Sequence, residues 1–348
     1  MSKHLYGFEW RQSPRALAKK ERAKSRKFAK AEVDVSDETI VDSIDPNEKA
    51  IVVTGSHGKF TVLQGDKILN EIKLGRGVDF KYTKYIVPGD YVGISETDSG
   101  SSISSIQRRT TQLSRTRVDS TRMGVSPDFE HVIAANIDVA VITVSPKNPP
   151  LHPGIIDRYC ILIQKNGIEP IICLNKSDLA EGSEENVLNE YRKLGIKIAK
   201  TSTVKHEGIE ELKGMLDSKT AVFVGHSGVG KSSLINAIIG KSYIKVGDVS
   251  EKTGKGKHTT TSSMLYKWNE RSYIIDTPGI RSLAMWGISK EELRLYFPEF
   301  EEYRQECKYR DCIHLHEREE DCGIKRALIS GNIPRQRYDS YIRILEEL

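Results

Sequence analysis

The sequence predicts a multidomain protein of the α/β class. It combines an OB-like β-barrel, a parallel sheet covered by helices on both faces, and a helical C-terminal unit. Three observations predict this architecture: short β-like runs after residue 48, apolar strands that alternate with helices from about residue 133, and a Cys/His cluster near the C-terminus. The 348 residues suffice for two or three domains with ample core.

Residues 1–48 are interpreted as a basic tail and an acidic linker. Residues 1–30 carry ten Lys and Arg against two Glu, whereas the whole chain has a formal net charge of only +5. The stretch 15–30 has few large apolar side chains, so it cannot bury a core of its own. Two interpretations stay open, namely a solvated tail and an arm that neutralises nucleic-acid phosphates.

Residues 49–112 form the predicted barrel, because several short strands in about 60 residues are typical of that fold. The expected strands, separated by turns that contain glycine, are Ala50–Thr54, Phe60–Leu63, Ile68–Ile72 and Tyr85–Ile94. The region lacks a dense aromatic stripe, so stacking of nucleic-acid bases is not strongly supported. The Ser-, Thr- and Arg-rich stretch 95–122 is interpreted as a mobile linker or an additional basic surface.

Residues 113–286 show strands that alternate with helices, which predicts a mostly parallel sheet covered on both faces. The expected strands are Ile137–Val144, Pro170–Leu174, Ile196–Lys200, Thr220–Val224 and Ser272–Ile275. The expected helices are Ile155–Asn166, Glu184–Leu194, Ile209–Leu216 and Lys231–Ile239. Residues 287–348, rich in charge and carrying the Cys/His cluster, form a separate unit.

A phosphate-binding loop follows the strand at 220–224. The segment GHSGVGKS fits G-x-x-x-x-G-K-[ST] and opens a helix, the context that this motif requires. Its backbone N–H groups can surround phosphate oxygens, Lys231 can reach the β- and γ-phosphates, and the Ser232 hydroxyl can coordinate Mg²⁺. The residues assigned to this site are Gly225, His226, Ser227, Gly228, Val229, Gly230, Lys231, Ser232 and Ser233.

Two further motifs complete a nucleotide site. Asp276 and Gly279 belong to DTPG after a strand, where the carboxylate can hold Mg²⁺ through water and the glycine N–H can sense the γ-phosphate. Asp178, in the sequence NKSD, can accept both the N1–H and the N2–H₂ of guanine, which selects GTP over ATP. The residues assigned to the base site are Asn175, Lys176, Ser177, Asp178, Thr201 and Ser202.

The order of these motifs indicates a circularly permuted P-loop GTPase domain. In GTPases of the Ras type the phosphate loop comes first, whereas here both base motifs precede it in the chain. The fold tolerates permutation because its termini lie close together.

The residue after DTPG is Ile280, which cannot orient the attacking water as a Gln does in Ras-like enzymes. His258, between the phosphate loop and DTPG, is the candidate catalytic residue because an imidazole titrates near neutrality. The alternative is a solvated loop histidine. Thr259 and Thr260 are candidates to complete the Mg²⁺ shell, together with Ser232.

Cys307, Cys312, His314 and Cys322 supply three thiolates and one imidazole, a set that tetrahedral Zn²⁺ favours. Four protein ligands leave no open position, so the ion is expected to be structural. His316 is a rival ligand. Cys160 and Cys173 lie in apolar stretches and are expected in the core.

These motifs together resemble the family of ribosome small-subunit-dependent GTPases of the RsgA/YjeQ type. The resemblance is based on the barrel, NKSD, GHSGVGKSS, GKGKHTTT, DTPGIR and the cluster CKYRDCIHLHEREEDC, and it covers most of the chain. It implies GTP hydrolysis in late maturation of the small ribosomal subunit, with that subunit and its rRNA as partners. It also favours His314 as the zinc ligand by its C-x-H step, although the gap before Cys322 is longer than in some members.

Composition excludes several other classes. The chain has no apolar run near the roughly 18 residues of a membrane span and no secretory signal at its start. Five unevenly placed cysteines fit a reducing cytoplasm rather than a disulfide framework. We expect a cytoplasmic monomer with GTP, Mg²⁺ and Zn²⁺. Its hydrolysis is expected to be stimulated by the subunit, and a GTP/GDP switch is expected to be coupled to the C-terminal zinc unit, so that the GTP-bound form binds small subunits more tightly. Two alternatives stay open: a permuted GTPase acting on another partner, and a GTP-switched RNA-binding scaffold that has lost hydrolysis.

Overall fold

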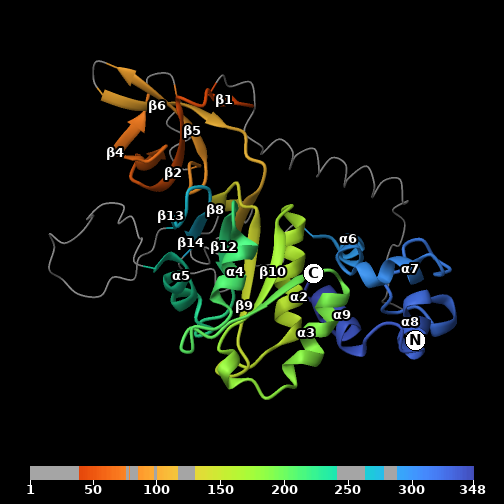
Figure 1. Cartoon of the computed structure of the whole chain (residues 1–348). Helices are drawn as coiled ribbons and strands as arrows, with labels where there is room; N and C mark the ends of the chain where they lie inside the picture. Colours follow the sequence, from red (N-terminus) through yellow and green to blue (C-terminus); the bar gives the residue numbers. More distant parts are fainter. Residues whose placement is uncertain are drawn as a thin grey trace, which may run out of the picture.

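The computed structural model describes residues 39–75, 78, 85–97, 100–116, 130–240, 263–277 and 288–348. The basic stretch 1–30 and the candidates His258, Thr259, Thr260 and Gly279 lie outside the described residues. Within the described ranges the chain builds a barrel, a sheet with helices on both faces and a C-terminal helical unit (Figure 1). None of the helices in these ranges is long and apolar enough to cross a membrane.

The barrel has the strand order of the OB fold. Its strands are β1 (Ile40–Val41), β2 (Lys49–Ser56), β3 (Lys59–Gln64), β4 (Lys67–Leu74), β5 (Tyr91–Thr97) and β6 (Gly100–Gln107). The described strands run β1-β6-β4-β3-β2-β5, and the pairing of β5 with β6 closes the barrel. The strand β4 runs parallel to β6, whereas the pairs β2–β3 and β3–β4 are antiparallel. Val52, Val62, Val92 and Ile103 are fully buried inside it.

The expected linker over 95–122 is wrong for much of its length, because β5, β6 and β7 (Gln112–Thr116) occupy it. Ile103 and Ile106 both belong to the barrel core although they lie three positions apart. A register shift makes this possible, since Ile94 pairs with Ile103 and Gly93 pairs with Ser105. The β-bulge breaks the two-residue alternation by which a strand is recognised in a sequence.

The barrel is fastened to the central sheet in two places. The strand β7 pairs antiparallel with β8 (Glu130–Ala135), and the adjoining Asn136 amide donates to the Gly89 carbonyl at 2.9 Å. The barrel strand β2 also lies against β13 (Met264–Lys267), where the Thr54 hydroxyl donates to the Ser263 carbonyl at 3.3 Å. The strand β13 forms a hairpin with the next strand, at whose end the DTPG motif begins. The barrel therefore contacts the strand that is paired with the one leading into this motif.

The central sheet has the order β11-β10-β9-β12-β14-β13. Its strands are β9 (Val139–Val144), β10 (Glu169–Leu174), β11 (Lys197–Lys200), β12 (Thr220–Val224), β13 and β14 (Tyr273–Asp276). All neighbouring pairs are parallel except β13–β14. Every residue of β9 and β12 is buried, which explains their continuous apolar sequences. The short strand β13 escapes detection in the sequence.

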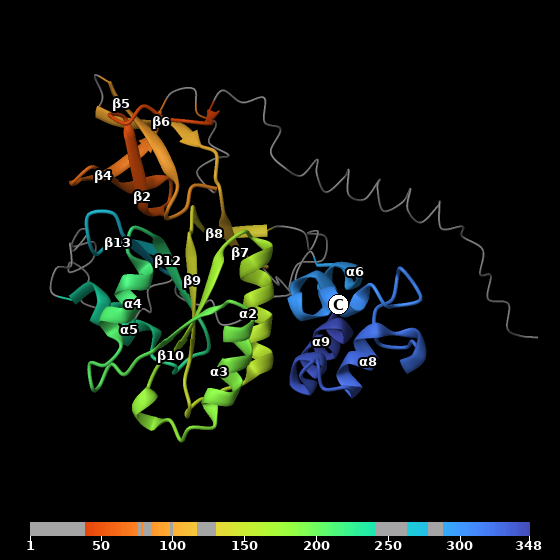
Figure 2. The same ribbon diagram turned by 45° about the vertical axis from the view of Figure 1, so that its right-hand side comes forward.

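Helices cover both faces of the sheet, as Figures 1 and 2 show. One face carries α2 (Pro153–Lys165) and α3 (Glu184–Lys193), and the other carries α4 (Ile209–Leu216) and α5 (Lys231–Ile239). The helices α4 and α5 agree with the expected bounds, and α2 and α3 differ from them by one or two residues at an end.

The C-terminal unit contains α6 (Lys290–Leu293), α7 (Glu301–Arg304), α8 (Gly323–Ile329) and α9 (Arg335–Glu347). Its core is aromatic: the Phe297 and Phe300 rings stack at 5.3 Å, and Tyr341 meets both edge-on. The helix α9 packs against α2, so this unit lies on the face of the sheet covered by α2 and α3 (Figure 2).

Candidate functional site

The predicted nucleotide motifs meet at one edge of the central sheet. Residues 175–178 follow β10, Thr201 and Ser202 follow β11, the loop at 225–230 follows β12, and Asp276 ends β14. These strands are parallel, so their carboxyl ends share the edge at which α/β sheets bind ligands. Motifs that are permuted along the chain thus come together in space.

The loop between β12 and α5 has the backbone that its glycines permit. Gly225, Gly228 and Gly230 have φ values of 139°, 86° and 93°, which side chains rarely tolerate. Space is a second constraint: a Cβ at Gly225 would lie 2.2 Å from the Thr143 carbonyl oxygen, and one at Gly230 would lie 2.3 Å from the Asn175 amide nitrogen. Both positions therefore need glycine for two reasons. The turn requires a positive φ, and a side chain would collide with the neighbouring residue.

Lys231 begins α5, and its side chain folds back over the loop. Its ammonium group donates to the carbonyl oxygens of Gly225 and His226, both at 2.8 Å. Burial raises the pKa of Asp276 across the site, and the charge of Lys231 opposes that shift. Cation and carboxylate thus lie close enough to influence each other, as phosphate- and Mg²⁺-binding groups at one site do.

Asn175 links the base motif to the phosphate loop. This side chain is fully buried, its amide donates to the Val229 carbonyl at 2.9 Å, and its oxygen accepts from the Thr201 hydroxyl at 3.2 Å. Thr201 in turn donates its backbone N–H to Leu174 and accepts from the backbone of Ser177. These hydrogen bonds therefore fix the relative positions of three loops that are distant in sequence.

Asp178 is oriented by the second base motif. The Ser202 hydroxyl donates to its carboxylate at 2.6 Å, and the same hydroxyl accepts the backbone N–H of Lys205 at 3.1 Å. A carboxylate fixed in this way presents its other lone pairs in a defined direction. It can receive a pair of parallel N–H donors, as the edge of guanine offers.

A loop that the motifs did not indicate also contributes. The segment between β9 and α2, SPKNPPLH, reaches the base motif, since the Lys176 ammonium donates to the Asn148 carbonyl at 3.0 Å. The same loop borders the phosphate loop, because a Cβ at Gly228 would lie 3.7 Å from the Asn148 oxygen. The paired prolines predict a turn but give no sign of these neighbours.

The C-terminal unit gathers the four predicted metal ligands. Donor atoms of Cys307, Cys312, His314 and Cys322 all lie within 4.8 Å of one another, and all but Cys307 are buried. The His314 Nδ1 lies 3.7, 3.1 and 3.5 Å from the three sulfurs, in chain order. His316 is exposed and does not join them.

This donor set fits a tetrahedral zinc ion. Sulfur and nitrogen atoms bound to one zinc ion lie roughly 3.5 to 3.8 Å apart, and the Cys312 and Cys322 sulfurs are separated by 3.8 Å. Burial lowers the pKa of His314 to about 4, so its imidazole is neutral and keeps a lone pair for coordination. Cys160 and Cys173 are buried apart from the cluster, and burial raises the pKa of both thiols.

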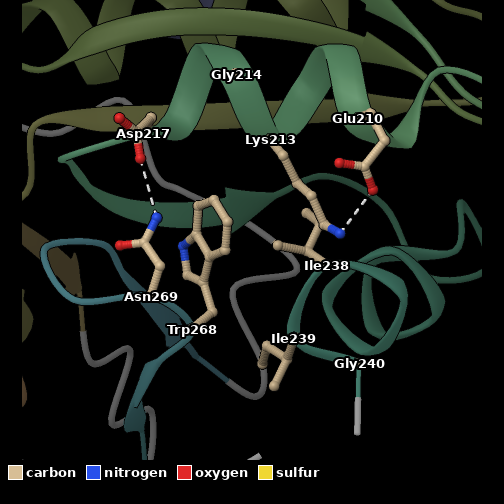
Figure 3. Close-up of a pocket in the computed structure, with 9 residues that line it drawn as sticks. All are labelled: Glu210, Lys213, Gly214, Asp217, Ile238, Ile239, Gly240, Trp268 and Asn269. Carbon is tan, nitrogen blue, oxygen red and sulfur yellow. Dashed lines mark hydrogen bonds and ion pairs between the residues drawn. The ribbon is translucent and has the colours of Figure 1, made fainter. Parts of the chain in front are cut away.

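A separate pocket lies between the side of α4, the end of α5 and the turn after β13 (Figure 3). Trp268 projects between the two helices there, and the Asn269 amide donates to Asp217 at 2.9 Å. None of the predicted GTP- or metal-binding residues is among the nine that line it.

Comparisons with known proteins find related sequences. Residues 106–286 match the family model of the RsgA GTPase. The small ribosomal subunit biogenesis GTPase RsgA of Chlorobaculum tepidum is 41% identical over 256 residues, covering 73% of this chain and 81% of that protein. The protein of the same name from Flavobacterium psychrophilum is 36% identical over 296 residues, covering 83% and 84%.

Solved structures show the same arrangement. The crystal structure of YjeQ from Thermotoga maritima superposes with a TM-score of 0.66 at 30% identity, covering 86% of this chain and 98% of that one. The structure of YloQ, described as a circularly permuted GTPase, gives a TM-score of 0.64 at 28% identity, covering 86% and 94%.

Proposed function

Because this chain belongs to the family of RsgA GTPases, we propose that its described loops bind GTP and that it works on the small ribosomal subunit. As a member of that family the chain is a GTP hydrolase. The observation that carries the site assignment is the contact network in which Asn175, Thr201 and Val229 hold the base and phosphate loops together. The residues assigned are 175–178, 201–202, 225–233, Asp276 and Gly279.

Selection of guanine is assigned to Asp178. Its carboxylate, oriented by Ser202, accepts the N1–H and N2–H₂ groups of guanine. Adenine offers no such donor pair, so binding it would leave the remaining acceptor positions of this half-buried carboxylate unmatched. A site that binds a ligand through such donor groups strongly rejects analogues that lack those groups.

Hydrolysis is assigned to groups around the γ-phosphate. Ser232, in the first turn of α5, is assigned as a Mg²⁺ ligand, and Thr259 or Thr260 is assigned to complete the shell. Mg²⁺ supplies charge neutralisation of the phosphates when bound. His258 orients the attacking water, since Ile280 has no polar group for that task. The variant His258→Ala is expected to bind GTP normally and to lose hydrolysis.

The metal cluster is assigned to one structural zinc ion per chain, held by Cys307, Cys312, His314 and Cys322. The donor spacing and the neutral imidazole support this choice. The zinc ion, when bound, would link the ligands to one another and so stabilise a loop that has little regular structure of its own. With all four positions taken by protein, the ion has no open site for catalysis.

The partner is proposed from the relatives, which carry the name of small ribosomal subunit biogenesis GTPases. An OB-type barrel and a basic N-terminal stretch on the same chain suit an RNA-rich partner. The cytoplasm, where ribosomal subunits mature in bacteria, is the corresponding location.

The deciding experiment measures phosphate release from GTP and from ATP, with and without purified small ribosomal subunits. We expect slow turnover of GTP alone, strong stimulation by small subunits, little by large subunits, and none of ATP hydrolysis. If saturating small subunits did not stimulate GTP hydrolysis, a GTPase with another partner would be favoured. Binding of subunits without any hydrolysis would favour the non-catalytic scaffold.

A further inference from the structure

A buried cluster of charged groups joins the C-terminal unit to the central domain. Arg337 of α9 is 6% exposed and forms an ion pair with Asp157 of α2, which is 1% exposed. The same guanidinium donates to both oxygens of Glu299, at 2.6 and 3.2 Å. On the other side Asp157 accepts the Tyr191 hydroxyl of α3 at 2.7 Å. Neither motif-based site uses these residues.

One end of this cluster leads to the nucleotide loops through α2. The same Tyr191 hydroxyl lies 3.0 Å from the Pro153 carbonyl oxygen, so its one hydrogen is shared between Asp157 and the first turn of α2. That turn directly follows the loop that Lys176 contacts. Two residues beyond Asp157, burial raises the pKa of the Tyr159 hydroxyl, and the nearby backbone of Gly225 opposes that rise. The helix α2 and the phosphate loop are therefore neighbours, so a shift of α2 can reach the loop.

The other end leads to the metal cluster through α9. The Tyr338 hydroxyl donates to the carbonyl of the ligand His314 at 2.6 Å, and the Tyr341 hydroxyl donates to the Ile313 carbonyl at 2.9 Å. Both tyrosines follow Arg337 on the same helix, Tyr338 directly and Tyr341 one turn further on. The loop that carries His314 thus holds α9 in the place from which Arg337 reaches Asp157.

The chemistry of the pair makes this connection sensitive to small shifts. Charges that are removed from water need close, well-oriented partners, so a displaced guanidinium would leave the Asp157 carboxylate buried and unpaired. Either α2 then moves or the carboxylate takes up a proton. A movement of α2 would displace the helix that lies beside the phosphate loop.

We propose that Arg337 and Asp157 couple the zinc cluster to the nucleotide loops, so that zinc binding and guanine-nucleotide binding strengthen each other. Arg337 acts as a positioning residue, since it touches neither ligand. The proposal rests on the zinc and nucleotide assignments made above. By linkage, the factor by which zinc tightens nucleotide binding equals the factor by which nucleotide tightens zinc binding.

The test is a thermodynamic cycle on the full-length protein. The dissociation constant of a fluorescent GDP analogue is measured for the zinc-loaded chain and for the Cys307→Ser/Cys312→Ser variant. Both are then measured again with Arg337→Gln added. We expect loss of zinc to weaken nucleotide binding about tenfold in the parent background. With Arg337→Gln the zinc-loaded chain is weakened by a similar factor, and loss of zinc has no further effect.

Arg158→Gln is the matched control. Arg158 follows Asp157 on α2 and pairs with Glu347 of α9, so its loss weakens the same interface at an exposed position. This variant keeps the tenfold effect of zinc if the buried pair carries the coupling. The zinc content of Arg337→Gln and Arg158→Gln is measured by elemental analysis, to check that both variants retain the metal.

Where Arg337→Gln alone does not fold, Asp157→Asn/Arg337→Gln replaces it, because Asp157 then carries no buried charge and only the less buried Glu299 loses its ion-pair partner. An equal effect of zinc with and without the buried pair would overturn the proposal, as would nucleotide affinity that does not respond to zinc. A parent chain that binds zinc but no GDP analogue would instead overturn the nucleotide assignment.

Discussion

Asn175→Ala tests whether the base and phosphate loops depend on one buried amide. The change removes two hydrogen bonds, to Val229 and from Thr201, and leaves a carbonyl and a hydroxyl buried without these partners. Each lost bond costs about 1 kcal/mol, and unpaired buried groups add to that. We therefore expect the free energy of unfolding to fall by about 2 to 4 kcal/mol.

Nucleotide affinity should fall as well, because the loops must now be ordered by the ligand itself. We expect GDP to bind about 10- to 100-fold more weakly, equivalent to about 1.4 to 2.8 kcal/mol. Isothermal titration calorimetry gives the affinity, and urea unfolding gives the stability.

Asn166→Ala is the control, since that amide donates to the Leu162 carbonyl at 2.7 Å at the far end of α2. It should lower stability modestly and leave GDP affinity unchanged. The reasoning fails if Asn175→Ala is destabilised yet binds GDP with the affinity of the parent chain.

Three further predictions concern the assigned residues. Asp178→Asn should weaken GTP binding and relax discrimination against other bases by several kcal/mol, in the order expected for a lost donor–acceptor match; competition binding with GTP, ITP and XTP measures this, and unchanged selectivity would contradict the base assignment. Lys231→Ala and Ser232→Ala should each nearly abolish phosphate release, the first through lost charge compensation and the second through lost Mg²⁺ coordination; substantial turnover in either would mean that the loop is misassigned. Cys307→Ser/Cys312→Ser should lose one zinc ion per chain and with it the order of the C-terminal unit, because structural zinc contributes folding free energy; zinc in the parent chain is measured by elemental analysis, and its absence there would refute the assignment.

Much of the central domain could be predicted because its strands and helices are regular. The bounds of α4, α5 and β12 follow directly from apolar periodicity and from the position of the phosphate loop. The barrel was harder, since the bulge opposite Gly93 places Ile103 and Ile106 on one face and breaks the alternation. Local pattern does not reveal such irregular registers.

In the candidate site, too, features that depend on adjacent residues could be predicted from the sequence, whereas contacts between distant residues could not. Motif spacing predicts roles for Asp178 and Lys231, because each belongs to a short motif of adjacent residues. The roles of Asn175 and Ser202 depend on contacts across 54 and 24 positions of sequence, to Val229 and to Asp178. The link through Arg337 and Asp157 spans 180 positions and has no motif at all. Such contacts follow only from the folded arrangement of α2 and α9.

The most direct test of the account is the affinity of the chain for small ribosomal subunits in its two nucleotide states. Sedimentation of labelled protein with subunits is measured with GDP and with a non-hydrolysable GTP analogue. The account predicts tighter binding with the analogue, the same difference in His258→Ala, and a matching gain in analogue affinity when subunits are present. Equal subunit affinity in both nucleotide states would contradict it.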